Sequence, residues 1–140
     1  MLIREIWKNI KNYEMVGTGA DYACAWLARL IAYKELGTLT TVEESEDWLH
    51  VNLLQVEPEV FGCILFVSDG NPSKDRTLRT AKFIKGLGRN TIGVTDTDGK
   101  EFPEGVDILQ IPSAEKDWIK PLLSFIPAAL LLAHLKDQIA

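Results

Sequence analysis

The sequence predicts an α/β protein, a three-layer αβα sandwich built on a five-stranded parallel sheet. Strand-like and helical segments alternate in units of about 20 to 30 residues, which is typical of parallel sheets with right-handed crossovers. The segment 61–67 is an unbroken apolar run, as expected for a strand that helices cover on both faces. Turn-forming residues at 17–19 and 69–73 follow strand-like segments and precede helical ones.

The first half of the chain is expected to begin with a short amphipathic helix, because apolar residues recur there at helical spacing. A strand, an alanine-rich helix that ends near Gly37, a second strand and a second helix follow. Small alanine side chains suit a helix that lies close to a sheet. The acidic run 43–47 is expected to open the last of these helices, since carboxylates favour the positive end of the helix dipole. The expected strands and outer helices span residues 2–12, 13–16, 38–42 and 43–54, and the alanine-rich helix has about 16 residues.

The second half continues the alternation. After the strand at 61–67, a helix is expected between the turn 69–73 and Gly88, with Asn71 or Ser73 as its N-cap and Pro72 allowed at its first position. Two strands and a final helix follow, with Pro121 and Pro127 expected to end a turn or kink the helix. These three elements span residues 91–95, 106–111 and 115–139.

Composition narrows the functional classes. The chain has 140 residues, enough for one domain, with 46% hydrophobic and 25% charged residues. The net charge of −5, with lysine and arginine dispersed, argues against nucleic acid as a partner. No apolar run approaches the roughly 20 residues of a membrane span, and the N-terminus lacks a signal-like apolar stretch, so we expect a cytoplasmic protein. Cys24 and Cys63 lack metal-ligand spacing, which predicts free buried thiols and no metal site. We expect no bound cofactor either.

Ligands of such sheets bind at the carboxyl ends of the strands, which points to the loops at 17–20, 43–50, 68–73 and 95–99. Gly17-Thr18-Gly19 between a strand and a helix suits a phosphate, a sugar hydroxyl or a carboxylate, with a purely structural turn as the alternative. A nicotinamide dinucleotide is a weak third alternative, since Tyr22 stands where the fingerprint needs its last glycine. No P-loop motif is present.

Several motifs together resemble the sugar isomerase (SIS) domain, a flavodoxin-like sandwich. They are Val16–Gly19, a helix ending in Tyr33–Glu35, an acidic segment reaching His50, the strand Ile92–Asp96 and the closing helix Pro127–His134. The chain is most similar to the second SIS lobe of phosphosugar isomerases and deglycases related to glucosamine-fructose-6-phosphate aminotransferase. The resemblance covers nearly all of residues 1–140 and implies one lobe of a pair, with a homodimer or a second SIS lobe completing the site.

The resemblance also implies roles for particular residues. Glu35 matches the carboxylate that moves a proton between C1 and C2 of the open-chain sugar through an enediol. His50 matches the histidine that helps to open the sugar ring, often in the pocket of a neighbouring subunit. The expected sugar-phosphate contacts come from the two glycine-containing loops: Gly17, Thr18, Gly19, Ser68, Gly70, Asn71 and Ser73.

Both catalytic assignments have plain structural alternatives: Glu35 as a solvated charge, His50 as a packing histidine. Asp69 lies in the second loop and would repel a phosphate, and Val51-Asn52 replaces the family's Gly-Pro after the histidine. The aminotransferase relatives have a C-terminal tail with a catalytic lysine, and no residue of this sequence matches that lysine. The competing hypothesis is therefore a non-catalytic SIS module that senses a sugar phosphate or supports assembly.

Overall fold

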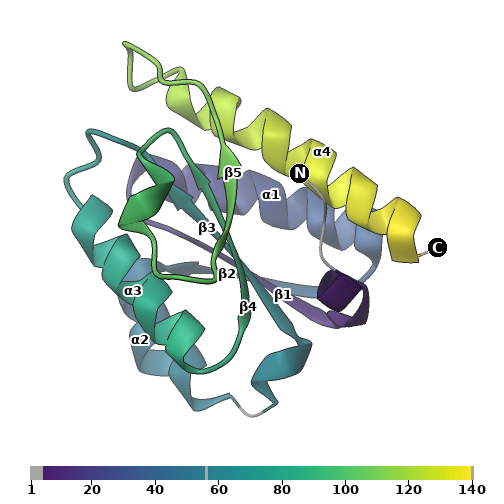
Figure 1. Ribbon diagram of the computed structural model, residues 1–140. Coiled ribbons are helices and arrows are strands. Elements are labelled where there is room, and N and C mark those ends of the chain that lie inside the picture. The colour runs from purple at the N-terminus through teal and green to yellow at the C-terminus, as the bar shows by residue number, and fades with distance from the viewer. Residues whose placement is uncertain (1–4, 56, 140) are drawn as a thin grey trace.

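A five-stranded parallel sheet with helices on both faces forms the molecule over residues 5–55 and 57–139, which the computed structural model describes (Figure 1). The strands are β1 (Asn12–Gly17), β2 (Leu39–Glu44), β3 (Phe61–Val67), β4 (Asn90–Thr95) and β5 (Asp107–Gln110). They lie in the order β2-β1-β3-β4-β5, and every neighbouring pair is parallel. The predicted fold class is confirmed.

Four helices form the two outer layers. They are α1 (Ala20–Leu36), α2 (Ser45–Val51), α3 (Lys74–Gly86) and α4 (Lys120–Ile139). α1 and α4 lie side by side on one face of the sheet, and α2 and α3 cover the other (Figure 1). Because β1 connects outward to β2 while β3 connects the opposite way to β4, the loops after β1 and β3 diverge around a crevice. This is the switch point at which ligands of open parallel sheets bind.

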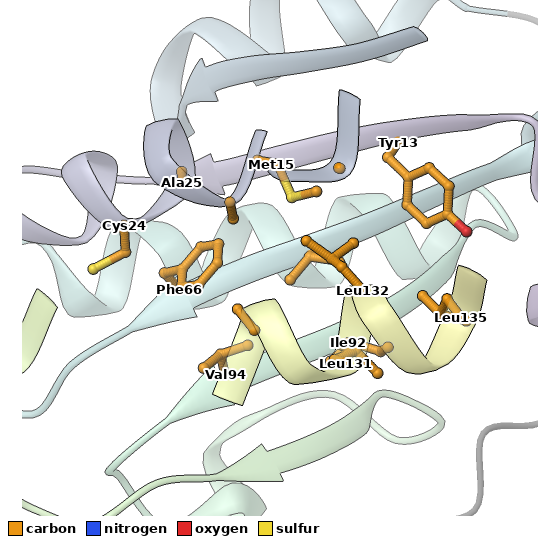
Figure 2. Packing of buried hydrophobic residues seen from close by; sticks show 14 of the residues in the cluster. Tyr13, Met15, Cys24, Ala25, Phe66, Ile92, Val94, Leu131, Leu132 and Leu135 are labelled. Carbon is orange, nitrogen blue, oxygen red and sulfur yellow. The ribbon is translucent and has the colours of Figure 1, made fainter. Parts of the chain in front are cut away.

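The core has one apolar cluster on each face of the sheet. On the face covered by α1 and α4, Tyr13 and Met15 of β1 cluster with Phe66 of β3 and with Leu132 and Leu135 of α4 (Figure 2). Burial raises the pKa of Tyr13 to about 12. Glu14, between these two residues, points to the other face of the sheet, toward α2, because side chains alternate along a strand.

Alanines let α1 approach the sheet closely, as the sequence predicts. A line of three, Ala25, Ala28 and Ala32, is fully buried against it. The packing densities of protein interiors leave little room there for a larger side chain.

The N-terminal segment differs from the prediction. A 3₁₀ helix spans Glu5–Asn9 in place of an α-helix over 2–12, and residues 2–4 of that prediction lie outside the described residues. β1 begins at Asn12, which pairs with Leu39 of β2 on one side and with Phe61 of β3 on the other. Pairing with two strands therefore ends the helical segment early.

The acidic run 43–47 does not open a helix at its first residue. Glu43 and Glu44 extend β2 beside Val16 and Gly17, and α2 begins only at Ser45. The Glu44 carboxylate accepts a hydrogen bond from the Glu46 amide at 3.1 Å, so it acts as a cap before the helix. α2 ends at Val51 and a 3₁₀ turn continues over Asn52–Leu54.

Prolines lie at two further differences, which concern the starts of α3 and α4. Pro72 precedes the N-cap Ser73 of α3 instead of occupying its first position, and Asn71 Oδ1 accepts from the Ser73 amide at 2.9 Å. α4 begins at Lys120, not at 115, with Pro121 in its first turn, where the missing amide costs little. Pro127 lies inside α4 and does not end it.

Candidate functional site

The turn between β1 and α1 is shaped by its glycines. A Cβ on Gly17 would lie 2.5 Å from the Asp21 carbonyl oxygen, a distance no side chain tolerates, so this position requires glycine. Gly19 has a φ of 60°, which is also a glycine conformation. The amides of Asp21 and Tyr22 bond to the Thr18 and Gly19 carbonyls, at 3.2 and 3.1 Å. The turn uses these amides internally, which leaves fewer donors for an anion than the motif alone suggests.

Asp21 joins this turn to the loop after β3. Its carboxylate accepts hydrogen bonds from the Ser68 amide at 2.9 Å, the Ser68 hydroxyl at 2.5 Å and Asn71 Nδ2 at 2.7 Å. Asn71 Nδ2 also donates to the Thr18 carbonyl at 2.9 Å. The side chain of Asp21 is buried, and burial raises the pKa of this carboxyl more than its hydrogen bonds lower it. The sequence-based site residues do not include Asp21, although its place in the first turn of a helix is a signal that could find it.

Four of the expected sugar contacts line one cavity. It has a volume of about 150 Å³ and is bordered by Gly19, Ser68, Gly70 and Asn71, with Asp21, Asp117 and Lys120 also in its lining. The largely covered ammonium of Lys120 donates to the Asp69 carbonyl and pairs with Asp117 at 3.2 Å. The cavity thus combines hydroxyl, amide, carboxylate and ammonium groups, a set suited to a polyhydroxylated ligand.

Thr18 and Ser73 line a second depression, of about 340 Å³, between the starts of α2 and α3. Arg76 and Arg79 supply its positive charge, while Glu44 and Asp75 supply negative charge. Beneath it, Thr18 Oγ1 donates to Ser45 Oγ at 2.8 Å. Gly17 lines neither the cavity nor this depression and supports the turn between them.

Asp69 is less isolated than the sequence suggests. Its carboxylate pairs with Lys74 at 3.3 Å, and its amide donates to Asp96 Oδ1 at 2.6 Å. The lysine partly offsets the charge that would repel a phosphate.

Glu35 lies far from these loops, at the end of α1 and hence at the amino-terminal edge of the sheet. Lys136 of α4 donates to Glu35 Oε2 at 2.7 Å. This hydrogen bond and the lysine's charge lower the pKa of the Glu35 carboxyl. A proton-abstracting carboxylate works best with a raised pKa, so the pair with Lys136 does not prepare Glu35 for that role in the isolated chain.

His50 lies on the opposite face of the sheet from Glu35, in the last turn of α2. Its side chain is 72% exposed, and Nε2 lies 3.6 Å from Glu46 Oε1. A carboxylate one helical turn away can orient the imidazole. The packing alternative for His50 is wrong, since the ring is largely in solvent. Glu35 and His50 therefore cannot serve one pocket within a single copy of the chain.

A buried ion pair that the sequence analysis does not single out lies behind α2. Glu14 of β1 pairs with Arg89, and both side chains are inaccessible to solvent. Glu14 also accepts from Trp48 Nε1 at 3.1 Å and Asn52 Nδ2 at 2.8 Å. Cys63 donates to the same carboxylate, and burial raises the pKa of its thiol well above the usual value. The network fastens α2 to the sheet.

Two classes of site are not seen in the described part of the chain. No three histidine, cysteine, aspartate or glutamate side chains there gather to hold a metal ion. None of the described helices is both long and apolar enough to cross a membrane. Cys24 and Cys63 are both free and buried.

Solved structures similar to this chain include sugar isomerase and phosphosugar isomerase domains. No family model and no curated protein matches the sequence. By structure, the chain is similar to the C-terminal domain of glucosamine-fructose-6-phosphate aminotransferase from Francisella tularensis, with a TM-score of 0.84 and 20% identity over 96% of this chain. It is also similar to tagatose-6-phosphate ketose/aldose isomerase from Escherichia coli, with a TM-score of 0.80 and 12% identity over 97% of this chain.

A third similar structure is the sugar isomerase domain of an RpiR transcription factor from Sphaerobacter thermophilus, with a TM-score of 0.69 and 18% identity. The match covers 96% of this chain and 74% of that one. The first two structures are longer: the chain spans 38% of the aminotransferase's C-terminal domain and 39% of the isomerase. The chain thus has the fold of an SIS domain, and within that class it resembles the aminotransferase's C-terminal domain.

Proposed function

We propose that this chain is a sugar-phosphate-binding SIS lobe of an aldose–ketose isomerase or sugar-amine deglycase. The observation that supports this function best is the cavity at the switch point of the sheet. There, Asp21 holds the loops after β1 and β3 together around hydroxyl, amide and ammonium groups. The fold shared with phosphosugar isomerases gives the ligand class.

Binding at this cavity follows from its chemistry. Sugar hydroxyls both donate and accept, so they suit Ser68 and Asn71 as well as the carboxylate of Asp21. Lys120 offers the positive charge that a phosphate needs. The arginines of the neighbouring depression extend the positive charge along the rim.

Catalysis in this proposal requires a composite site. The Glu35 carboxylate would take the proton from C2 of the open-chain aldose, leaving an enediol, and return it to C1 to give the ketose. His50 would transfer a proton to the ring oxygen as the hemiacetal bond breaks. Because the two residues lie on opposite faces of the sheet, they would act in two different pockets, each completed by another lobe.

The ion pair with Lys136 sets a condition on this mechanism. A substrate or a neighbouring lobe must separate Glu35 from Lys136, because the paired carboxylate has a lowered pKa and is a weak base. The freed ammonium of Lys136 would then be available to the developing enediolate oxygen.

Isomerisation of fructose 6-phosphate, with glucosamine 6-phosphate as the deglycase substrate, tests the proposal. Glu35→Gln should lower turnover by at least about a hundredfold, because it removes the proton acceptor. Glu104→Gln, which neutralises an exposed carboxylate elsewhere, is the matched control and should leave the rate unchanged. Equal activity of the wild type and Glu35→Gln removes Glu35 from the mechanism.

A non-catalytic sensor or assembly module is the second candidate, and the Glu35–Lys136 pair favours it. The hydrogen bond from Lys136 to Glu35 stabilises the contact between α4 and α1, and it does not prepare Glu35 to act as a base. Thermal shift with both sugar phosphates distinguishes the two functions. Stabilisation by a ligand without turnover, even with a first SIS lobe supplied, supports the sensor. Turnover that depends on Glu35 rejects it.

A further inference from the structure

The helix α3 concentrates positive charge in a chain that is acidic as a whole. One third of the chain's 15 lysines and arginines lie within its 13 residues, and Asp75 is its one acidic residue. With five cationic residues and one aspartate, α3 has a formal charge of +4, while the whole chain has −5. Along the sequence these cations are dispersed, but the helix gathers them on one element. They are Lys74, Arg76, Arg79, Lys82 and Lys85.

A groove lies between α3 and the 3₁₀ turn Gly99–Glu101. It has a volume of about 420 Å³, and it combines charged side chains with one apolar residue that is almost covered. The lining residues are Asp75, Leu78, Arg79, Lys82 and Glu101. We call these five residues the α3 groove. They share no member with the lining of the cavity at the switch point of the sheet, so the α3 groove is a separate feature of the surface.

Two cations of the α3 groove have no partner among the described residues. Neither Arg79 nor Lys82 forms an ion pair or a side-chain hydrogen bond in that part of the chain. Asp75 lies one helical turn before Arg79, a spacing that suits an ion pair, and yet the two do not pair. Glu101 pairs with Lys74 at 3.0 Å, which offsets its charge. The groove therefore keeps a positive charge that the chain itself does not neutralise.

An exposed aromatic ring lies next to the unpaired cations. Phe83 follows Lys82 directly, lies one helical turn after Arg79 and is 50% exposed. Leu87, which is 36% exposed, follows one turn later, just past the end of α3. Arginine and aromatic side chains are enriched in protein–protein interfaces and contribute much of their binding energy. This combination suits a protein ligand better than a small inorganic anion.

We propose that the α3 groove binds an extended acidic peptide segment of another protein. Carboxylates of the segment form charge-assisted hydrogen bonds with Arg79 and Lys82, while an apolar side chain of the segment packs on Phe83. The second depression shares Asp75 and Arg79 with the groove, so the two hollows adjoin along α3. From Ser73 to Lys82 they follow about 14 Å of helix, which is the length of about four extended residues.

The carboxylates around the α3 groove favour a peptide over a nucleic acid. Asp75 lies within the groove, and Glu46 pairs with Arg76 beside it at 2.9 Å. An unbroken row of phosphates would meet these carboxylates as well as the cations, whereas a peptide can place an uncharged residue opposite each of them. The net charge of −5 also opposes binding of a polyphosphate. Peptide binding here does not depend on sugar chemistry, so it stands or falls separately from the proposed function.

Fluorescence anisotropy with a labelled peptide and the full chain tests this docking site. The probe is a short peptide of four glutamates and two leucines between terminal glycines, and its counterpart has glutamine in place of glutamate. The wild type should bind the glutamate peptide saturably and the glutamine peptide at least about tenfold more weakly. Arg79→Glu and Lys82→Glu should each raise the dissociation constant at least about tenfold, because repulsion replaces attraction. Phe83→Ala should raise it about threefold, because the apolar contact is lost.

Lys34→Glu is the matched control, since it changes the net charge by the same amount at an exposed position of α1, in the other helical layer. It should leave the dissociation constant within about twofold of the wild type. Circular dichroism should show that all four variants stay folded, because the replaced side chains are exposed.

Three results would overturn the proposal. The first is a wild type that shows no saturable binding of the glutamate peptide. The second is equal weakening by Lys34→Glu and Lys82→Glu, which indicates attraction by net charge alone. The third is tighter binding of an oligothymidylate, or of vesicles of phosphatidylcholine and phosphatidylserine, than of the peptide.

Discussion

Each of the two helical layers covers one face of the sheet, but the side chains that they expose to solvent differ. The exposed positions of α3 include Asp75, Arg76, Arg79 and Lys82, as expected for an amphipathic helix with one face in solvent. In α1 the exposed positions carry alanine, leucine, tryptophan and tyrosine, and the one charged residue among them is Lys34, near the end of the helix. Since both layers already bury their inner sides, the apolar outer side of α1 and α4 does not serve the chain's own core. The difference separates residues needed for folding from residues available for association.

The layers also differ in how they attach to the sheet. The α1/α4 layer packs through alanines and leucines around Met15 and Phe66 (Figure 2). The α2/α3 layer adds a buried polar network around Glu14, in which Arg89 also stacks on Trp48 with 4.9 Å between the guanidinium carbon and the ring centroid. Apolar packing tolerates small shifts of a helix, while a hydrogen-bonded charge network fixes one position.

Glu14→Gln should have the largest effect on stability. The change leaves the Arg89 guanidinium buried without its counter-charge, so the free energy of unfolding should fall by about 3–5 kcal/mol. Urea denaturation followed by circular dichroism measures this loss. The double variant Glu14→Gln with Arg89→Met should lose less than the sum of the single changes, because it removes both charges. Strict additivity would show that the pair does not act as a unit.

Ala28→Leu tests the apolar attachment of α1. Ala28 is fully buried against the sheet, and the added carbons have no space, so we expect a loss of about 1–3 kcal/mol. Ala23→Leu places the same side chain at an exposed position of the same helix and should leave the unfolding free energy nearly unchanged. If both variants lose equally, helix packing does not set the stability of this layer.

Much of the fold is predictable from the sequence because periodicity reports burial directly. The unbroken apolar segment 61–67, the alanine-rich helix and the two glycine-containing loops all appear where the pattern places them. The start of α2 is not predictable in this way, because Glu43 and Glu44 join the sheet through pairing with β1, a contact between distant segments. Long-range pairing also explains the short N-terminal helix.

The candidate site is less predictable than the fold. The loops after β1 and β3 come together as expected, but Asp21, which binds them, is separated from Ser68 by 47 positions. Glu14 and Arg89 are 75 positions apart, and a charged residue inside an apolar strand is the one local signal of their pair. Glu35 and His50 are close in sequence, yet a strand between them carries the chain from one edge and face of the sheet to another.

Asp21→Asn tests the link between the two layers, because Asp21 belongs to α1 and binds the loop that leads to α3. Replacing one carboxylate oxygen by an NH₂ group removes an acceptor, which should cost about 1 kcal/mol near neutral pH. The cost should be larger near pH 4. Burial raises the pKa of Asp21, so the wild type loses stability as the pH rises from the group's ordinary pKa through its raised one, and the asparagine variant does not.

Urea denaturation of both proteins at several pH values between about 4 and 7 measures this difference. Asp69→Asn, at the exposed neighbouring carboxylate, is the control and should not reproduce the trend. A difference between wild type and Asp21→Asn that grows with rising pH would contradict the assignment of burial as the dominant cause of the shift.

Arg76→Ala should have the smallest effect on the free energy of unfolding. Arg76 of α3 pairs with Glu46 of α2 at 2.9 Å, across the outer side of the charged layer. Both side chains are more than two-fifths exposed, so water already solvates them well and the loss should be at most about 1 kcal/mol. Sodium chloride should reduce even this difference, since it screens exposed charges. A loss as large as that of Glu14→Gln would mean that the surface pair, and not the buried network, holds α2 and α3 together.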